Sequence, residues 1–169
     1  MDGYIILVGM MGAGKSTVGK ILAENLNLPF VDSDTLIERR LGRKIDSFFK
    51  NYGEEAFREH EHNTFAELEP EPGVLSTGGG VVLREDNWEQ LKRLGTVVYL
   101  SASPETLIAR LEASKRKRPL LEREDWKDHL RTILDQRTRL YEQADIHISV
   151  DNVDLRTAAE LIEFQLGEE

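Results

Sequence analysis

With 169 residues, 40% of them hydrophobic and 31% charged, the chain is long enough for one globular domain with a substantial core. A net charge of −9 argues against nucleic acid as the main partner, and no apolar run nears the roughly 20 residues of a membrane span. The absence of cysteine excludes disulfides and thiolate metal sites. We therefore expect no nucleic-acid or membrane partner, no signal peptide and a cytoplasmic location.

Residues 9–16, GMMGAGKS, form the first pattern with chemical meaning, because they fit G-x-x-x-x-G-K-[ST]. The apolar run 4–8, a predicted strand, precedes them, and a helical pattern follows. In this context the backbone N–H groups and the helix dipole favour an anion, Lys15 adds a positive charge, and Ser16 offers Mg²⁺ a hydroxyl. A plain glycine turn is the alternative. The predicted nucleotide-binding residues of the loop are Gly12, Ala13, Gly14, Lys15, Ser16 and Thr17.

Apolar segments alternate with helical patterns along the rest of the chain. Short strands separated by helices imply crossover connections and a parallel sheet that is covered on both faces. Thr35 and Glu38 fit a capping box, and Ser103 precedes a proline at a first helical position. We find no repeat or linker, so we predict a single domain over residues 1–169. The predicted strands are 4–8, 30–31, 74–76, 96–100 and 146–150, and the predicted helices begin near Lys15, Thr35, Glu54, Asp86, Pro104, Trp126 and Leu155.

Polar residues gather where the predicted strands end. Asp32 and Asp34 follow the second strand and three glycines, 78–80, follow the third, so both should meet the phosphate-binding loop at one mouth of the sheet. A protein with this loop usually holds Mg²⁺ through a second acidic residue, and only the second strand supplies one. In an extended segment the two aspartates would point to the same side. We predict Asp32 near the metal and Asp34 near the accepting hydroxyl, with helix N-capping as the alternative for either residue alone.

Three arginines are candidates for handling the negative charges of the substrates. Phosphoryl transfer needs positive charge at the moving phosphate, and Arg118, in a basic run, is predicted to bring it when a lid of about residues 112–125 closes. A solvated basic run or a weak nucleic-acid patch is the alternative. Arg58 and Arg137 lie on predicted helices, where most arginines are surface residues. Their planar guanidinium groups nevertheless suit bidentate binding of a carboxylate.

Six separated blocks of the chain form a combined signature: residues 9–19, 30–34, 53–61, 76–83, 118–121 and 137–141. The phosphate-binding loop alone indicates only a nucleotide-binding class. Together with the D-x-D, F-R-x-x-E, triple-glycine and R-P-L-L blocks, however, it resembles the shikimate kinase family from Gly9 to about Val150. The resemblance implies a nucleoside-monophosphate-kinase-like α/β sandwich of three layers, with a five-stranded parallel sheet in the order 2-3-1-4-5, a mobile lid and a monomeric state.

The resemblance also implies a reaction, the Mg²⁺-dependent transfer of the ATP γ-phosphoryl group to the 3-hydroxyl of shikimate. The products would be ADP and shikimate 3-phosphate, on the route to chorismate and the aromatic amino acids. Lys15 and Arg118 would stabilise the transferring phosphate, Ser16 and Asp32 would serve the metal, and Arg110 would stack on adenine. The implied acceptor-binding residues are Asp34, Arg58, Gly79, Gly80 and Arg137.

Two alternatives of different classes remain open at this point. The residues alone indicate a small acceptor with a carboxylate and a hydroxyl, so a gluconate or nucleotide kinase on the same fold is the nearest rival, although Arg58 and Arg137 argue against a neutral acceptor. The second alternative is a regulatory nucleotide-binding module without catalysis, and the presence of Lys15 and Asp34 argues against it. Asp34 could act as a base or only orient the hydroxyl. Residues 150–154 match the family's adenine-contact loop poorly.

Overall fold

Five parallel strands form the central sheet of the computed structural model, which describes residues 2–115 and 118–167. Their order is β2-β3-β1-β4-β5, so the order and the parallel pairing expected from the sequence are confirmed. Every residue of β1 is buried, because this strand lies at the centre with β3 and β4 on its two sides. The strands are β1 Tyr4–Val8, β2 Phe30–Asp32, β3 Gly73–Ser76, β4 Gly95–Ser101 and β5 Ile146–Ser149.

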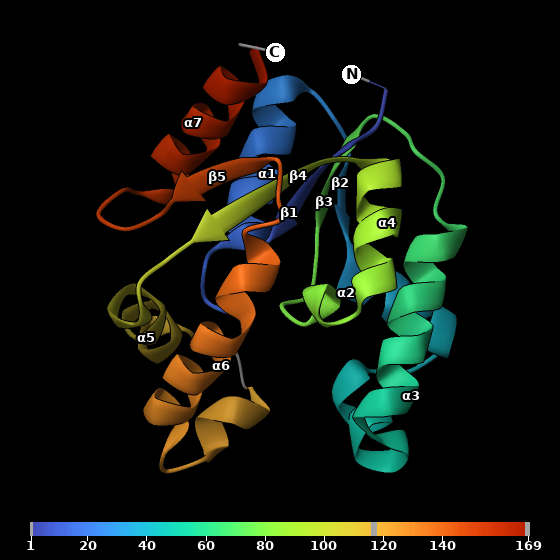
Figure 1. Ribbon diagram of the computed structural model, residues 1–169, viewed down its shortest axis with the longest axis vertical. Helices are drawn as coiled ribbons and strands as arrows, with labels where there is room; N and C mark the ends of the chain where they lie inside the picture. The colour runs from blue at the N-terminus through green and yellow to red at the C-terminus, as the bar shows by residue number, and fades with distance from the viewer. Residues whose placement is uncertain (1, 116–117, 168–169) are drawn as a thin grey trace.

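Helices cover both faces of this sheet, as Figure 1 shows, with α4 and α6 in front of the strands and α1 behind them. On the rear face α7 packs against α1, and on the front face α3 packs against α4. The α-helices are α1 Lys15–Leu26, α2 Ser33–Leu41, α3 Ile45–Glu67, α4 Glu85–Leu94, α5 Pro104–Ala113, α6 Trp126–Tyr141 and α7 Leu155–Gly167. Short 3₁₀ helices span Val81–Leu83 (η1) and Pro119–Glu122 (η2).

The long helix α3 departs from the prediction of a helix that begins near Glu54. It begins nine residues earlier, at Ile45, and Gly53 interrupts it with a non-helical conformation (φ 82°). Its first half stays attached through a small apolar cluster of Ile37, Phe48 and Phe57 that is separate from the main core. The sequence pattern identified only the half that follows the glycine.

The start of α2 also differs from the prediction. The capping box expected at Thr35 is wrong, because α2 already begins at Ser33 and the Asp32 carboxylate accepts a hydrogen bond from the backbone N–H of Asp34 at 2.9 Å. Asp34 therefore lies in the first helical turn and not on an extended strand. Glu38, the other residue of the expected box, instead accepts from the backbone N–H of Ile45 at 3.2 Å and holds the start of α3.

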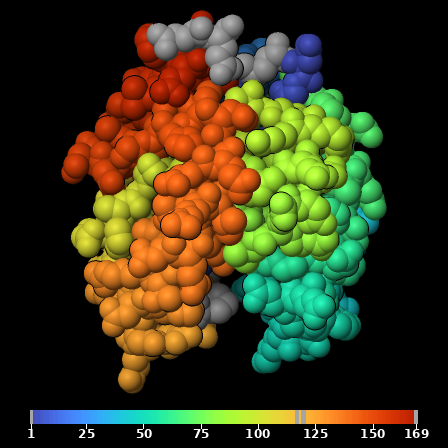
Figure 2. All heavy atoms as spheres, viewed as in Figure 1, coloured from blue at the N-terminus to red at the C-terminus, as the bar shows by residue number. Residues whose placement is uncertain are grey.

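The carboxyl ends of the strands face one edge of the molecule, and both chain termini lie toward the opposite edge (Figure 1). Beyond the strand ends, α3 and α6 extend on either side, and Figure 2 shows the surface hollowed between them. Residues 116 and 117 of the expected lid lie outside the described residues. Within the described part of the chain, no helix is long and apolar enough to cross a bilayer.

Candidate active site

A cavity of about 470 Å³ opens at the carboxyl ends of β1, β2 and β3. It brings together the phosphate-binding loop, the two aspartates after β2 and the glycines after β3, so the prediction that these groups share one mouth is confirmed. Ala13, Arg58, Gly80 and Arg137 are not among the lining residues. The predicted site residues that line the cavity are Gly12, Gly14, Lys15, Ser16, Thr17, Asp32, Asp34, Gly79, Arg110 and Arg118.

Lys15 folds back over the loop that precedes it. Its Nζ donates hydrogen bonds to the carbonyl oxygens of Gly9 (2.6 Å) and Met10 (2.9 Å), and its side chain is buried at the start of α1. Burial lowers the pKa of Lys15 to about 8, and the nearby Asp34 carboxylate opposes this shift. Gly14, the N-cap of α1, has φ 95°, which favours glycine. The loop thus places a cation beside the backbone N–H groups of a helix N-terminus, the arrangement that binds phosphate.

Asp32 uses its two carboxylate oxygens differently. Oδ1 caps α2, whereas Oδ2 accepts a hydrogen bond from Ser16 Oγ at 3.4 Å, and Ser16 Oγ lies 3.5 Å from Ser76 Oγ. Asp32 is therefore both the N-cap of α2 and a neighbour of the Ser16 hydroxyl, the group predicted to bind the metal. Carboxylate and hydroxyl oxygens suit Mg²⁺, which binds through one or two protein ligands and substrate phosphates. The described residues contain no cluster of three or more His, Cys, Asp or Glu side chains that could hold a metal without such help.

Asp34 reaches into the cavity from α2 and lies against the first of the three glycines. A Cβ at Gly78 would lie 3.1 Å from Asp34 Oδ1 and 3.5 Å from Glu61 Oε2. Glycine at this position therefore lets two carboxylates approach the backbone that follows β3. The Asp34 side chain also acts electrostatically on Lys15, so the acidic group and the phosphate-binding cation belong to one site.

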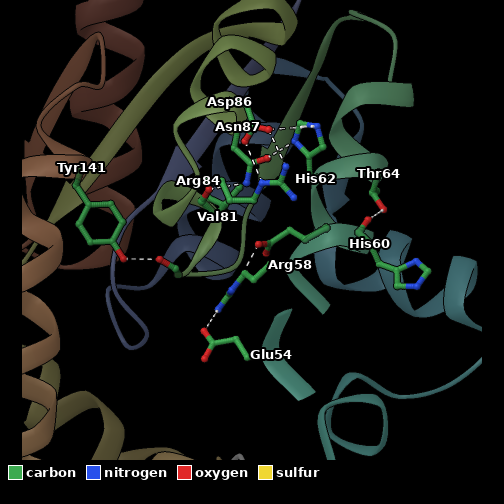
Figure 3. A network of polar contacts seen from close by, with 12 residues as sticks. Glu54, Arg58, His60, His62, Thr64, Val81, Arg84, Asp86, Asn87 and Tyr141 are labelled. Carbon is green, nitrogen blue, oxygen red and sulfur yellow. Dashed lines mark hydrogen bonds and ion pairs between the residues drawn. The ribbon is translucent and has the colours of Figure 1, made fainter. Parts of the chain in front are cut away.

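Arg58 is held by a buried carboxylate on its own helix. Its Nη1 donates to Glu61 Oε1 at 2.8 Å, and its Nη2 makes a longer contact of 3.4 Å to the exposed Glu54 (Figure 3). Glu61 has no exposed side-chain area, its Oε2 has no hydrogen-bond partner among the described residues, and burial raises its pKa. A Cβ at Gly80 would lie only 2.2 Å from Arg58 Nη2, so the guanidinium group packs directly on that glycine.

Arg137 approaches the glycines from the opposite side, on α6. A Cβ at Gly79 would lie 3.7 Å from Arg137 Nη1 and 3.5 Å from both Gly9 O and Met11 N of the phosphate-binding loop. Tyr141, one turn further along α6, donates from its hydroxyl to the Gly79 carbonyl oxygen at 2.5 Å. The two predicted arginines therefore flank the glycines, and the glycines adjoin the phosphate-binding loop.

Arg110 connects the phosphate-binding loop to residues 150–154. It donates to the carbonyl oxygens of Ala13 (3.0 Å) and Val150 (3.3 Å), and burial lowers its pKa. The next residue, Asp151, accepts from the Ser103 backbone N–H at 2.9 Å and anchors this segment to the start of α5. Residues 150–154, which match the family's adenine-contact loop poorly, thus lie beside Arg110, a residue that lines the cavity.

Sequence reasoning assigned no role to Glu61 or Tyr141, although both contact predicted site residues. A signal for each was present in the helical spacing, because Glu61 follows Arg58 by three residues and Tyr141 follows Arg137 by four. That spacing puts each pair on one helix face. It does not say which face meets the glycines.

A parallel sheet with a phosphate-binding loop after its central strand, an acidic pair after the next and a cationic cavity between them defines a P-loop kinase fold. Residues 11–165 match the family model for shikimate kinase. The shikimate kinase of Gloeobacter violaceus is 44% identical over 94% of this chain and 89% of its own length, and that of Vibrio parahaemolyticus is 43% identical over 97% and 96%. The chain belongs to the shikimate kinase family.

Solved structures agree with this assignment. The Acinetobacter baumannii shikimate kinase in complex with shikimate gives a TM-score of 0.89 at 39% identity, over 99% of this chain and 94% of that one. The Aquifex aeolicus shikimate kinase gives 0.82 at 33% identity, over 97% and 96%. A gluconokinase from Sinorhizobium meliloti, with a TM-score of 0.58 and 18% identity over 99% and 94%, shares the fold alone.

Proposed function

We propose that this protein transfers the γ-phosphoryl group of ATP to the 3-hydroxyl of shikimate, giving ADP and shikimate 3-phosphate. The observation that carries the proposal is the pair of arginines, Arg58 and Arg137, that flanks the glycines beside the phosphate-binding loop. A carboxylate held by guanidinium groups there would place the acceptor next to the donor phosphates. Membership of the shikimate kinase family supports the same acceptor, and it makes ATP the expected donor.

The donor half of the proposed site is the loop before α1. Backbone N–H groups at the helix N-terminus bind the phosphates, and Lys15 places its ammonium group beside them. Arg110 faces the same cavity from α5, where we assign it to the adenine. Arg118 lines the cavity too, and we assign it to the transferring phosphoryl group, with residues 112–125 as the lid that excludes water.

Ser16 and Asp32 are the residues that would hold Mg²⁺. The oxygen atoms of this pair fit a hard cation, as their mutual contact and their place in the cavity indicate. When bound, the ion would neutralise part of the charge on the β- and γ-phosphates. The capping bond from Asp34 N–H to Asp32 keeps the carboxylate directed toward Ser16.

Asp34 is the residue that we assign to the acceptor hydroxyl. Its carboxylate lies against Gly78 and within the field of Lys15, so a hydroxyl between them would be oriented toward the donor. Orientation is sufficient for a loose transition state, in which little proton transfer is needed before the phosphoryl group moves. We further propose that the protein is a monomer with one domain over residues 1–169. It would work in the cytoplasm, where ATP is abundant.

A coupled ADP-release assay with shikimate, gluconate, CMP and AMP tests the acceptor directly. We expect release that depends on shikimate and on Mg²⁺, and that is absent from a Lys15→Ala variant. Turnover with gluconate or a nucleotide in place of shikimate would contradict the proposal. ATP hydrolysis that is independent of any acceptor would contradict it as well.

A further inference from the structure

We propose that Tyr141 is a positioning residue for the acceptor, because its hydroxyl fixes the Gly79–Gly80 peptide that lies beside Arg137. This inference deepens the proposed function and rests on it. Tyr141 lies at the end of α6, has no exposed side-chain area, and does not line the cavity. It therefore acts through the groups that it holds and not by contact with substrate.

Packing against the sheet holds the ring of Tyr141 in place independently of its hydroxyl. It stacks on Tyr99 of β4, with ring centroids 5.1 Å apart and planes inclined by 17°, and His147 of β5 packs edge-on against Tyr99 at 5.8 Å. Two strands of the sheet thus hold the aromatic pair. The hydroxyl then donates to the Gly79 carbonyl oxygen at 2.5 Å, as Figure 3 shows.

This hydrogen bond sets the direction of the next N–H group. In a planar trans peptide the carbonyl of Gly79 and the N–H of Gly80 point to opposite sides. With the carbonyl held by Tyr141, the Gly80 N–H is directed away from α6. Consecutive glycines lack the side chains that restrict such a peptide, so its plane depends on an external anchor. The anchored peptide lies between the phosphate-binding loop and Arg137.

Arg137 acts electrostatically on the same phenol. Its guanidinium, one helical turn earlier on α6, opposes the rise in the pKa of the Tyr141 phenol. Burial is the stronger effect and raises the pKa of Tyr141 to about 12. The phenol therefore remains protonated at neutral pH. It keeps its proton for donation to the Gly79 carbonyl oxygen, and Arg137 lies beside the same glycine.

Tyr141→Phe tests the inference, with Tyr99→Phe as the matched control. Both changes remove one hydroxyl from the stacked pair and keep both rings. Wild type and variants are compared for KM of shikimate, KM of ATP, kcat, melting temperature, and shikimate Kd by calorimetry without nucleotide. For Tyr141→Phe we expect KM and Kd of shikimate to rise about tenfold, since the buried hydrogen bond that orients the Gly79–Gly80 peptide is lost. KM of ATP should stay within about twofold, and Tyr99→Phe should match wild type in every constant.

Three outcomes would overturn the inference. Tyr141→Phe with a lower melting temperature but an unchanged shikimate KM would show a structural role only. Equal effects on the KM of ATP and of shikimate would show a general loosening of the site. A wild-type protein that releases no ADP with shikimate would overturn the proposed function, and this inference with it, whereas an active wild type separates the two questions.

A second variant covers the case in which Phe at position 141 prevents folding. Replacement of Tyr141 by p-aminophenylalanine keeps the ring and supplies an N–H donor in place of the hydroxyl. We expect it to restore the shikimate KM to within about threefold of wild type, because the Gly79 carbonyl regains its donor. An amine variant that folds but shows a tenfold rise would contradict the role of this hydrogen bond.

Discussion

Replacement of Lys15 by methionine is expected to abolish turnover and, at the same time, to stabilise the fold. Methionine is similar in length to lysine and carries no charge. Burial lowers the pKa of Lys15 from an ordinary 10.5 to about 8, which corresponds to about 3 kcal/mol against the charged form in the native state. The two hydrogen bonds to Gly9 and Met10 are lost in the variant and remove about 1–2 kcal/mol of that gain.

The net change for Lys15→Met is therefore a gain of about 1–2 kcal/mol at pH 7, or about 2–8 °C in melting temperature for a chain of this size. The sign depends on pH. Between pH 8 and 10.5 the unfolded chain keeps the lysine proton that the native state has lost, so the wild type gains stability relative to the variant as the pH rises. This gain amounts to about 2–3 kcal/mol by pH 10, so the advantage of Lys15→Met at pH 7 should disappear and the wild type should be the more stable protein at pH 10.

Urea unfolding of wild type, Lys15→Met and the control Lys50→Met at pH 7, 8, 9 and 10 measures these differences. Lys50 is exposed on α3, and its replacement should change the free energy of unfolding by less than about 0.5 kcal/mol at each pH. A Lys15→Met protein that is less stable than wild type at pH 7, by an amount that does not vary with pH, would refute the argument. It would mean that the ammonium group stabilises the empty loop.

Four further substitutions test the two halves of the site. Asp34→Asn should lower kcat by about 100-fold or more while the Kd of ATP changes little, and wild-type kcat would exclude the role assigned to the carboxylate. Arg58→Lys should lower kcat/KM for shikimate, with a loss of about 1–3 kcal/mol in transition-state stabilisation, because lysine cannot bind a carboxylate bidentately. Asp151→Ala should raise the KM of ATP, and not that of shikimate, through loss of the Ser103 anchor, and the same assay decides. Glu61→Gln should leave the melting temperature at pH 7 unchanged or higher, since burial already disfavours the charged form, yet raise the shikimate KM. A lower melting temperature with an unchanged KM would contradict this.

The alternation of strands and helices, and the functional residues at the carboxyl ends of the strands, could be predicted from the sequence. The apolar run of β1, the phosphate-binding loop and the glycines after β3 were placed correctly because parallel strands share one edge at their carboxyl ends. The prediction of a capping box at Thr35 was wrong because another N-cap residue precedes Thr35 in the chain. Asp32 lies directly before the helix, and its carboxylate satisfies the N–H of Asp34 first.

Long-range contacts are what the sequence could not supply. The half of α3 before Gly53 was missed because its apolar residues face a small separate cluster with α2 and not the main core. The roles of Glu61 and Tyr141 depend on which helix face meets the glycines, a matter of tertiary packing. Helical spacing alone pairs each with an arginine, but the same spacing is common on solvent-exposed faces.

The pKa values of two buried groups, Lys15 and Glu61, are shifted by the same physical cause. Burial works against the charged form of each, lowering the pKa of the lysine and raising that of the carboxyl. Neither charge is therefore explained by the stability of the unliganded fold. Each has a role in the proposed function: Lys15 complements the charge of the donor phosphates, and Glu61 holds Arg58, which complements that of the acceptor carboxylate. A site prepared in this way gives up stability before the substrates bind and recovers it when they do. ATP should therefore raise the melting temperature of wild type more than that of Lys15→Met, whereas shikimate alone should raise both equally.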